Sequence, residues 1–141
     1  MVTLIGMGSG SWEALSAQAQ DAVRRAGLVF GAKRLLAGLP PECTARQFAL
    51  YQPAEILETL AQAPGQDAAV LYSGDTGFYS GASGLLTPLR ALGIPARVYP
   101  GVSSIQLLAA ALGRPWQDWK LVSAHGCACD PVAECMTERS V

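Results

Sequence analysis

The sequence lacks the run of roughly 18 apolar residues that a membrane-spanning helix requires. It also lacks a surplus of charge of either sign, because 10 Lys and Arg residues face 11 Asp and Glu residues and the pI is about 5.7. A nucleic-acid binder would show a basic stripe, so this balance argues against that class. No basic stretch precedes an apolar segment at the amino terminus, so no signal peptide is visible. We therefore expect a soluble cytoplasmic protein without a membrane or nucleic-acid partner.

Cysteine and histidine are scarce, with four cysteines and one histidine in the chain. Three of the cysteines, Cys127, Cys129 and Cys135, follow His125 closely, and thiolates with an imidazole are the ligands that zinc prefers. Ligands spaced one residue apart on an extended chain do not readily close a tetrahedron, so zinc is the minor alternative. We expect reduced thiols and no metal.

Apolar residues are plentiful, at 50% of the chain, which is enough for a sizeable core. Their periodicity predicts that strands and helices alternate, which indicates an α/β fold with a parallel-rich, doubly wound sheet flanked by helices. The uninterrupted apolar run at 68–72 is typical of a central strand that is covered on both faces. The predicted strands are 2–5, 28–30, 46–50, 68–72 and 96–99, and the predicted helices are 13–26, 32–37, 53–63, 81–92 and 105–112, with Ser11 as the cap of the first helix and Gly27 as its stop.

The pattern changes after Gly113, where Arg114-Pro115-Trp116 interrupts the alternation. We interpret residues 1–113 as an amino-terminal α/β domain with glycine-rich loops and residues 114–119 as a linker. Residues 120–141 would then be the stub of a second α/β domain, which begins with a strand at 120–123.

Three glycine-rich turns follow predicted strands, and the first is Gly6-Met7-Gly8-Ser9-Gly10. Its glycines would let a ligand approach the backbone closely. The dinucleotide fingerprint needs another glycine where Ser11 stands, and an acid at the end of the second strand, which is absent. NAD is therefore disfavoured, and a phosphate loop is excluded because no Gly-Lys-Ser/Thr follows. A tight turn without a ligand stays open as an alternative.

The second turn, Ser73-Gly74-Asp75-Thr76-Gly77-Phe78-Tyr79-Ser80-Gly81, leaves the central strand. Its freed backbone groups could bind an adenosine or amino-acid moiety, and its aromatic rings could wall that ligand. For Asp75 we favour a carboxylate that accepts from the N–H of Gly77 or Phe78 and shapes the loop, rather than a catalyst.

The third turn is Pro100-Gly101-Val102-Ser103-Ser104, where two hydroxyls precede a helix. Capping explains one serine well, and the second could donate to a ligand near the positive end of the helix dipole. Right-handed crossovers would bring all three turns to the carboxyl edge of the sheet. Their convergence is a stronger signal than any one turn.

In this order the three turns resemble those of the tetrapyrrole methylase family, and the resemblance runs from Val2 to about Gly126. It implies two α/β domains, the cofactor S-adenosylmethionine, a tetrapyrrole substrate and a homodimer. Within the family, Gly31-Ala32-Lys33-Arg34-Leu35, the second turn and Ser123-Ala124-His125-Gly126 look most like the branch that methylates C5 of cobalt-precorrin-7. Members generally have Asp-Pro in the second turn, where this chain has Asp75-Thr76. The tail after Gly126, where Cys127 replaces the usual arginine, does not resemble the family.

The resemblance also implies roles for residues of the three turns. Tetrapyrrole contacts would come from the first loop and the second domain, through Gly8, Gly10 and His125. Cofactor contacts would come largely from backbone atoms, at Ser9, Ser73, Gly74, Asp75, Phe78, Ser103 and Ser104.

The function that these resemblances imply is C-methyl transfer from S-adenosylmethionine to C5 of a precorrin or cobalt-precorrin in cobalamin biosynthesis. The ring carbon would attack the sulfonium methyl group in line, so the protein's main task would be orientation. No catalytic residue is assigned: His125 alone titrates near neutrality, and we favour a structural role for it. The alternatives are another methylase of the superfamily, acting on diphthine or ribosomal RNA, and a truncated, non-catalytic ligand-binding or interaction module. A decarboxylase partner is left open.

Overall fold

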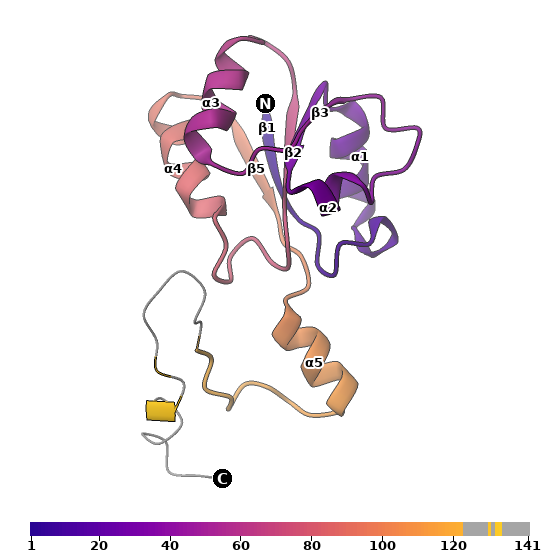
Figure 1. The fold of residues 1–141 in the computed structure, drawn as a ribbon, viewed down its shortest axis with the longest axis vertical. Coiled ribbons are helices and arrows are strands. Elements are labelled where there is room, and N and C mark those ends of the chain that lie inside the picture. The colour runs from indigo at the N-terminus through magenta and orange to yellow at the C-terminus, as the bar shows by residue number, and fades with distance from the viewer. Residues whose placement is uncertain (123–129, 131, 134–141) are drawn as a thin grey trace.

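The computed structural model describes residues 1–122, 130 and 132–133. These residues form a five-stranded sheet in the order β3-β2-β4-β1-β5, in which every pair of neighbours is parallel (Figure 1). This confirms the α/β class. The strands are β1 (Val2–Gly6), β2 (Leu28–Gly31), β3 (Arg46–Phe48), β4 (Ala68–Tyr72) and β5 (Ala96–Tyr99).

The central strand β4 and its neighbour β1 are buried because helices cover both faces of the sheet (Figure 1). Alternate residues point to opposite faces, so Ile5 packs toward α1 (Ala17–Arg25) and α2 (Lys33–Leu36). Leu4 packs on the other face, toward α3 (Pro53–Ala61) and α4 (Ala82–Ala91). The continuous apolar run at 68–72 is therefore the central strand that the sequence predicted.

The helix predicted at 13–26 is wrong at its start, because the chain forms a short 3-10 helix, η1 (Trp12–Ala14), before α1. Ser16 is a strong capping residue, and its Oγ accepts a hydrogen bond from Ala19 N at 3.3 Å. Ser11 does not cap; its hydroxyl donates to Glu13 at 2.5 Å. The helix also ends before Gly27, since Ala26 is already extended.

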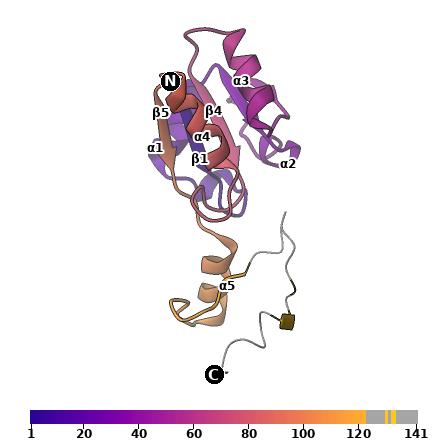
Figure 2. The ribbon, with the colours of Figure 1, turned by 90° about the vertical axis from the view of Figure 1, so that its left-hand side faces the viewer.

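The last helix, α5 (Ser104–Leu112), extends away from the sheet (Figures 1 and 2). It ends at Gly113, whose φ of 62° is the left-handed conformation that glycine adopts most readily. Residues 114–122 form neither helix nor strand, which contradicts the described part of the strand predicted at 120–123. A strand needs a neighbour for its backbone hydrogen bonds, and residues 120–122 pair with none of the described strands. Among the described residues no helix is long and apolar enough to cross a membrane.

Candidate functional site

The first two turns meet at the carboxyl edge of the sheet, where two backbone hydrogen bonds join them. Gly8 N donates to Gly74 O at 3.0 Å, and Gly74 N donates to Gly8 O at 2.9 Å. Both glycines have positive φ values, 56° and 65°, that residues with a side chain rarely adopt. The predicted convergence of these two turns is therefore present as a direct bridge.

The third turn closes against the same bridge. A Cβ added to Gly6 would lie 2.6 Å from Gly101 N and 2.7 Å from Gly74 O. Real carbon atoms do not approach backbone atoms so closely, so only glycine fits at this contact. One backbone atom from each of three segments distant in sequence thus meets at a single point.

Asp75 fastens the second turn to the third. Its Oδ2 accepts from Gly77 N at 2.9 Å, and its Oδ1 accepts from Gly101 N at 3.1 Å. Both carboxylate oxygens therefore hold backbone N–H groups in place. The interpretation of Asp75 as the residue that shapes the loop is confirmed for Gly77, and the bond to Gly101 extends it.

The two serines of the third turn have different surroundings. Ser103 is buried, its Oγ accepts from Gln106 N at 3.3 Å, and its own N–H donates to Gln106 Oε1 at 2.8 Å. This reciprocal pair is a capping box, which confirms capping as the role of one serine. Ser104 is exposed, so its hydroxyl is the one more open to a ligand.

The exposed Ser73 hydroxyl has a partner that the sequence interpretation did not assign to the site. Arg34, on α2, donates from Nη2 to Ser73 Oγ. The two residues lie 39 positions apart, but β2 and β4 are neighbours in the sheet, so residues that follow these strands can meet. The sequence offered one signal for this contact, which is that a basic residue follows β2, the strand next to the central strand β4.

The two aromatic residues of the second turn pack against each other. The rings of Phe78 and Tyr79 pack edge to face with centroids 4.8 Å apart. Phe78 is half-buried, whereas Tyr79 is exposed and its hydroxyl donates to Leu121 O at 3.5 Å. Thr76 is buried and its Oγ1 donates to Tyr99 O at 3.4 Å.

The remaining predicted residues divide between this edge and the part of the chain that is not described. Ser9 is exposed on the first loop, and Gly10 lies beside α2. His125 and the three cysteines near it (Cys127, Cys129 and Cys135) lie outside the described residues, so their predicted roles stay predictions. Within the described ranges, no group of three potential metal ligands occurs.

Tyr72 ends the central strand, and burial raises the pKa of its hydroxyl to about 12. The phenol therefore stays protonated at neutral pH and does not act as a base there. The edge supplies backbone groups, hydroxyls, aromatic faces and the Arg34 guanidinium. Such an arrangement can bind and orient a ligand.

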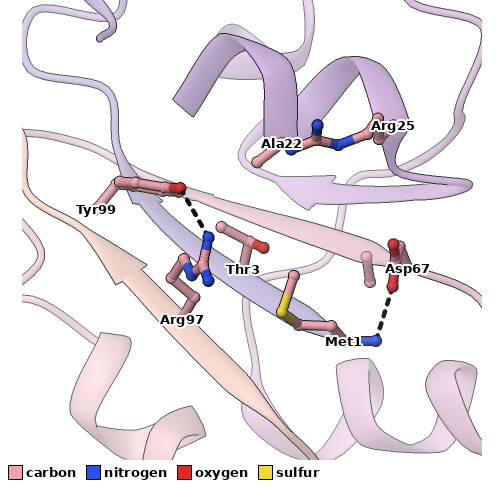
Figure 3. A pocket seen from close by; sticks show the side chains of 8 residues that line it. Met1, Thr3, Ala22, Arg25, Asp67, Arg97 and Tyr99 are labelled. Atoms are coloured by element: carbon pink, nitrogen blue, oxygen red, sulfur yellow. Dashed lines mark hydrogen bonds and ion pairs between the residues drawn. The ribbon is translucent and has the colours of Figure 1, made fainter. Parts of the chain in front are cut away.

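A separate small pocket lies between α1 and the strands β1, β4 and β5 (Figure 3). Its polar contacts are an ion pair between the Met1 ammonium group and Asp67 at 2.8 Å and a bond from Arg97 to the Tyr99 hydroxyl at 3.4 Å. None of the residues that the sequence predicted for a site lines it. Its lining consists of Met1, Thr3, Ala22, Arg25, Asp67, Ala68, Arg97 and Tyr99.

Comparison with known proteins agrees with this architecture. Residues 1–139 match the model of the tetrapyrrole (corrin/porphyrin) methylases. The cobalt-precorrin-7 C(5)-methyltransferase of Salmonella typhimurium is 34% identical over 128 residues, which cover 89% of this chain and 62% of that protein. The chain therefore spans less than two thirds of that relative's length.

Two solved structures share the fold at somewhat lower identity. The methyltransferase CobJ matches 81% of this chain and 51% of its own, at 27% identity and a TM-score of 0.69. The uroporphyrin-III C-methyl transferase of Thermus thermophilus, in complex with S-adenosylhomocysteine, matches 89% of this chain and 52% of its own, at 27% identity and a TM-score of 0.64. With the family model matching nearly its whole length, this chain belongs to the tetrapyrrole (corrin/porphyrin) methylase family.

Proposed function

We propose that the three joined turns bind S-adenosylmethionine and that the chain serves in a methyltransferase acting on C5 of a precorrin or cobalt-precorrin in cobalamin biosynthesis. The observation that carries the proposal is the clamp of Asp75 on the second and third turns, together with the Gly8–Gly74 bridge to the first. An edge fixed in this way presents its remaining backbone groups without further ordering on binding, which favours affinity.

The residues at this edge fit the two ends of the cofactor. Gly74 has no side chain, so a ligand can approach the turn closely at that point, although the N–H and C=O of Gly74 are engaged with Gly8. Phe78 offers a half-buried aromatic face suited to a flat adenine ring. The exposed hydroxyls of Ser73, Ser104 and Ser9 are donors suited to the polar amino-acid end.

When bound, S-adenosylmethionine supplies an electrophilic methyl group on a sulfonium. The task of the chain is then to hold that group against an electron-rich ring carbon and to keep water away. Pre-orientation of this kind can supply as much as about 7–11 kcal/mol of the barrier in well-aligned systems. We assign no base, because both oxygens of Asp75 are engaged and the high pKa of Tyr72 keeps its hydroxyl protonated.

The position of methylation and the partners are finer parts of the proposal. The 34% identity to the Salmonella enzyme supports C5 of a cobalt-precorrin as the position. Four further parts of the proposal come from the sequence analysis alone. They are a homodimer, a cytoplasmic location, a decarboxylase partner and the division into domains at 1–113 and 120–141. The exposed apolar side chains of α5 support self-association.

Calorimetry with S-adenosylhomocysteine tests the cofactor site. We expect the wild-type chain to bind with a dissociation constant in the micromolar range. Asp75→Ala should abolish binding because Gly77 and Gly101 lose the acceptor that holds them, and Gly74→Val should abolish it because a branched side chain disfavours positive φ.

Asp21→Ala is the matched control, since Asp21 lies on the surface of α1 and, among the described residues, forms its ion pairs with Arg24 and Arg25 of the same helix. Circular dichroism must show that each variant is folded. Absence of binding by the wild-type chain would overturn the proposed cofactor, and wild-type affinity in both turn variants would overturn its location.

A further inference from the structure

Arg34 is a cation at the carboxyl edge whose protein partner is neutral. Its Nη2 donates to the Ser73 hydroxyl, and no carboxylate among the described residues lies within ion-pair distance of its guanidinium. A guanidinium has five N–H donors in a planar fork, so most of them stay available. Arg34 is also exposed, which leaves its open side accessible to a ligand.

The guanidinium reaches two of the three turns at once. Besides its bond to Ser73 in the second turn, its Nη1 lies 3.9 Å from the position that a Cβ on Gly10 would occupy in the first. Asp75, the acid of the second turn, does not pair with this guanidinium, and its two oxygens accept from the backbone N–H groups of Gly77 and Gly101. The side chain thus offers a positive charge beside the edge where the proposed cofactor would lie.

We propose that Arg34 is a substrate-binding residue that pairs with a carboxylate on the periphery of the tetrapyrrole and sets the ring's position over the second turn. The inference rests on the proposed function. A planar fork matches a carboxylate in bidentate fashion, which fixes orientation as well as affinity. Ser73 would hold the guanidinium ready for this pairing.

The cofactor also ends in a carboxylate, so the two sources of this chemistry must be separated. S-adenosylhomocysteine carries the amino-acid end, whereas 5′-methylthioadenosine lacks it. If Arg34 paired with the cofactor, its removal would weaken binding of the first compound and spare the second. If Arg34 pairs with the substrate instead, we expect Arg34→Gln to bind S-adenosylhomocysteine and 5′-methylthioadenosine with unchanged affinities, within about twofold.

The direct test is a fluorescence titration of the full chain with uroporphyrin, a porphyrin whose peripheral side chains all end in carboxylates, in the presence of saturating S-adenosylhomocysteine. Arg34→Gln should bind uroporphyrin about 10- to 100-fold more weakly, the range for loss of a charge-assisted pair. Arg34→Lys should recover part of the affinity because it restores the charge but not the fork. Lys33→Gln is the matched control, an equal charge change at the neighbouring exposed position of α2.

Two further measurements distinguish pairing from a structural effect. The wild-type affinity for uroporphyrin should fall with added salt more steeply than that of Arg34→Gln, because a charge pair is screened. A porphyrin with cationic side chains should bind equally poorly to both. Equal uroporphyrin affinities in wild type and Arg34→Gln, or no uroporphyrin binding by a chain that binds S-adenosylhomocysteine, would overturn the role of Arg34 alone. Absence of S-adenosylhomocysteine binding by the wild-type chain would overturn the proposed function itself.

Discussion

Gly6 and Gly101 show how single residues build this site, because their missing side chains let the first and third turns touch. A side chain at Gly101 would collide with the backbone oxygens of Gly74 and Gly6. Backbone atoms inside a packed edge cannot move aside as the end of a flexible side chain can. The contact therefore depends on residue identity at two positions that lie far apart in the sequence.

We expect Gly101→Ala to lower the free energy of unfolding by about 3 kcal/mol or more, because the added methyl group must displace the backbone of the neighbouring turns. The matched control is Gly84→Ala inside α4, where the added Cβ would lie in ordinary contact 3.6 Å from Pro53. Alanine is the better helix former, so the control should gain about 0.5–1 kcal/mol. Urea unfolding of the two variants checks both signs, and similar stabilities would contradict the close approach described at Gly101.

At the scale of single elements, the start of α5 separates a structural serine from one that is free to bind. Ser103 caps the helix through Gln106, whereas Ser104 is exposed on its first turn. Ser103→Ala should lower the free energy of unfolding by about 1 kcal/mol, the usual cost of losing an N-cap. Ser104→Ala should change it by less than about 0.5 kcal/mol.

In cofactor affinity the order should be reversed, so that Ser104→Ala has the larger effect and Ser103→Ala the smaller one. If Ser104 donates to the amino-acid end of the cofactor, Ser104→Ala weakens S-adenosylhomocysteine binding about tenfold, which is the loss of one good hydrogen bond. Thermal unfolding and calorimetry on the same samples provide the comparison. A large loss of stability in Ser104→Ala would mean that its hydroxyl is part of the fold.

The elements were largely predictable where one signal dominated. The apolar run 68–72 is a strand at the predicted bounds, because burial on a sheet leaves a short apolar pattern between turn residues. The segment 96–99 is also a strand at the predicted bounds, although its residues are half-buried or exposed, because turn residues bound it on both sides. The helix at 13–26 was not predictable from its apolar face alone. Ser16, a better cap than Ser11 in this context, begins α1 after a separate 3-10 turn, and periodicity does not register that competition.

The meeting of the three turns was also predictable, since the topology of a parallel sheet places loops after strands at one edge. The second bond of Asp75, to Gly101, and the contact of Arg34 with Ser73 were not. Each joins residues far apart in the sequence, and such pairings depend on strand order, here β3-β2-β4-β1-β5. Local patterns identify which residues can bind, and the order of strands decides which of them meet.

At the scale of the whole molecule, α5 is the helix whose apolar side chains are not covered by the sheet. Its sequence from Ser104 to Leu112 contains no charged residue, and Leu107, Leu108 and Leu112 are 45%, 49% and 57% exposed. Figures 1 and 2 both show α5 projecting beyond the sheet. An apolar helix held in water in this way loses the stabilisation of burial, about 25 cal/mol per Å² of apolar surface.

We expect a second copy of the chain to cover this face, in keeping with the proposed homodimer. Two copies of this uncharged helix can pack against each other about a twofold axis without repulsion between like charges. Leu108 and Leu112 lie one turn apart on the same side of α5, so Leu108→Gln with Leu112→Gln removes a contiguous apolar strip.

Light scattering coupled to size-exclusion chromatography should therefore report a dimer for the wild-type chain and a monomer for the double variant. Leu92→Gln is the control, because Leu92 is at least as exposed, at 63%, but follows α4 instead. It should leave the dimer intact if association is specific to α5 and not a general consequence of exposed leucine. A wild-type monomer at the highest concentration tested would show that this face is covered in some other way, and dissociation by Leu92→Gln would move the interface to the α4 side of the sheet.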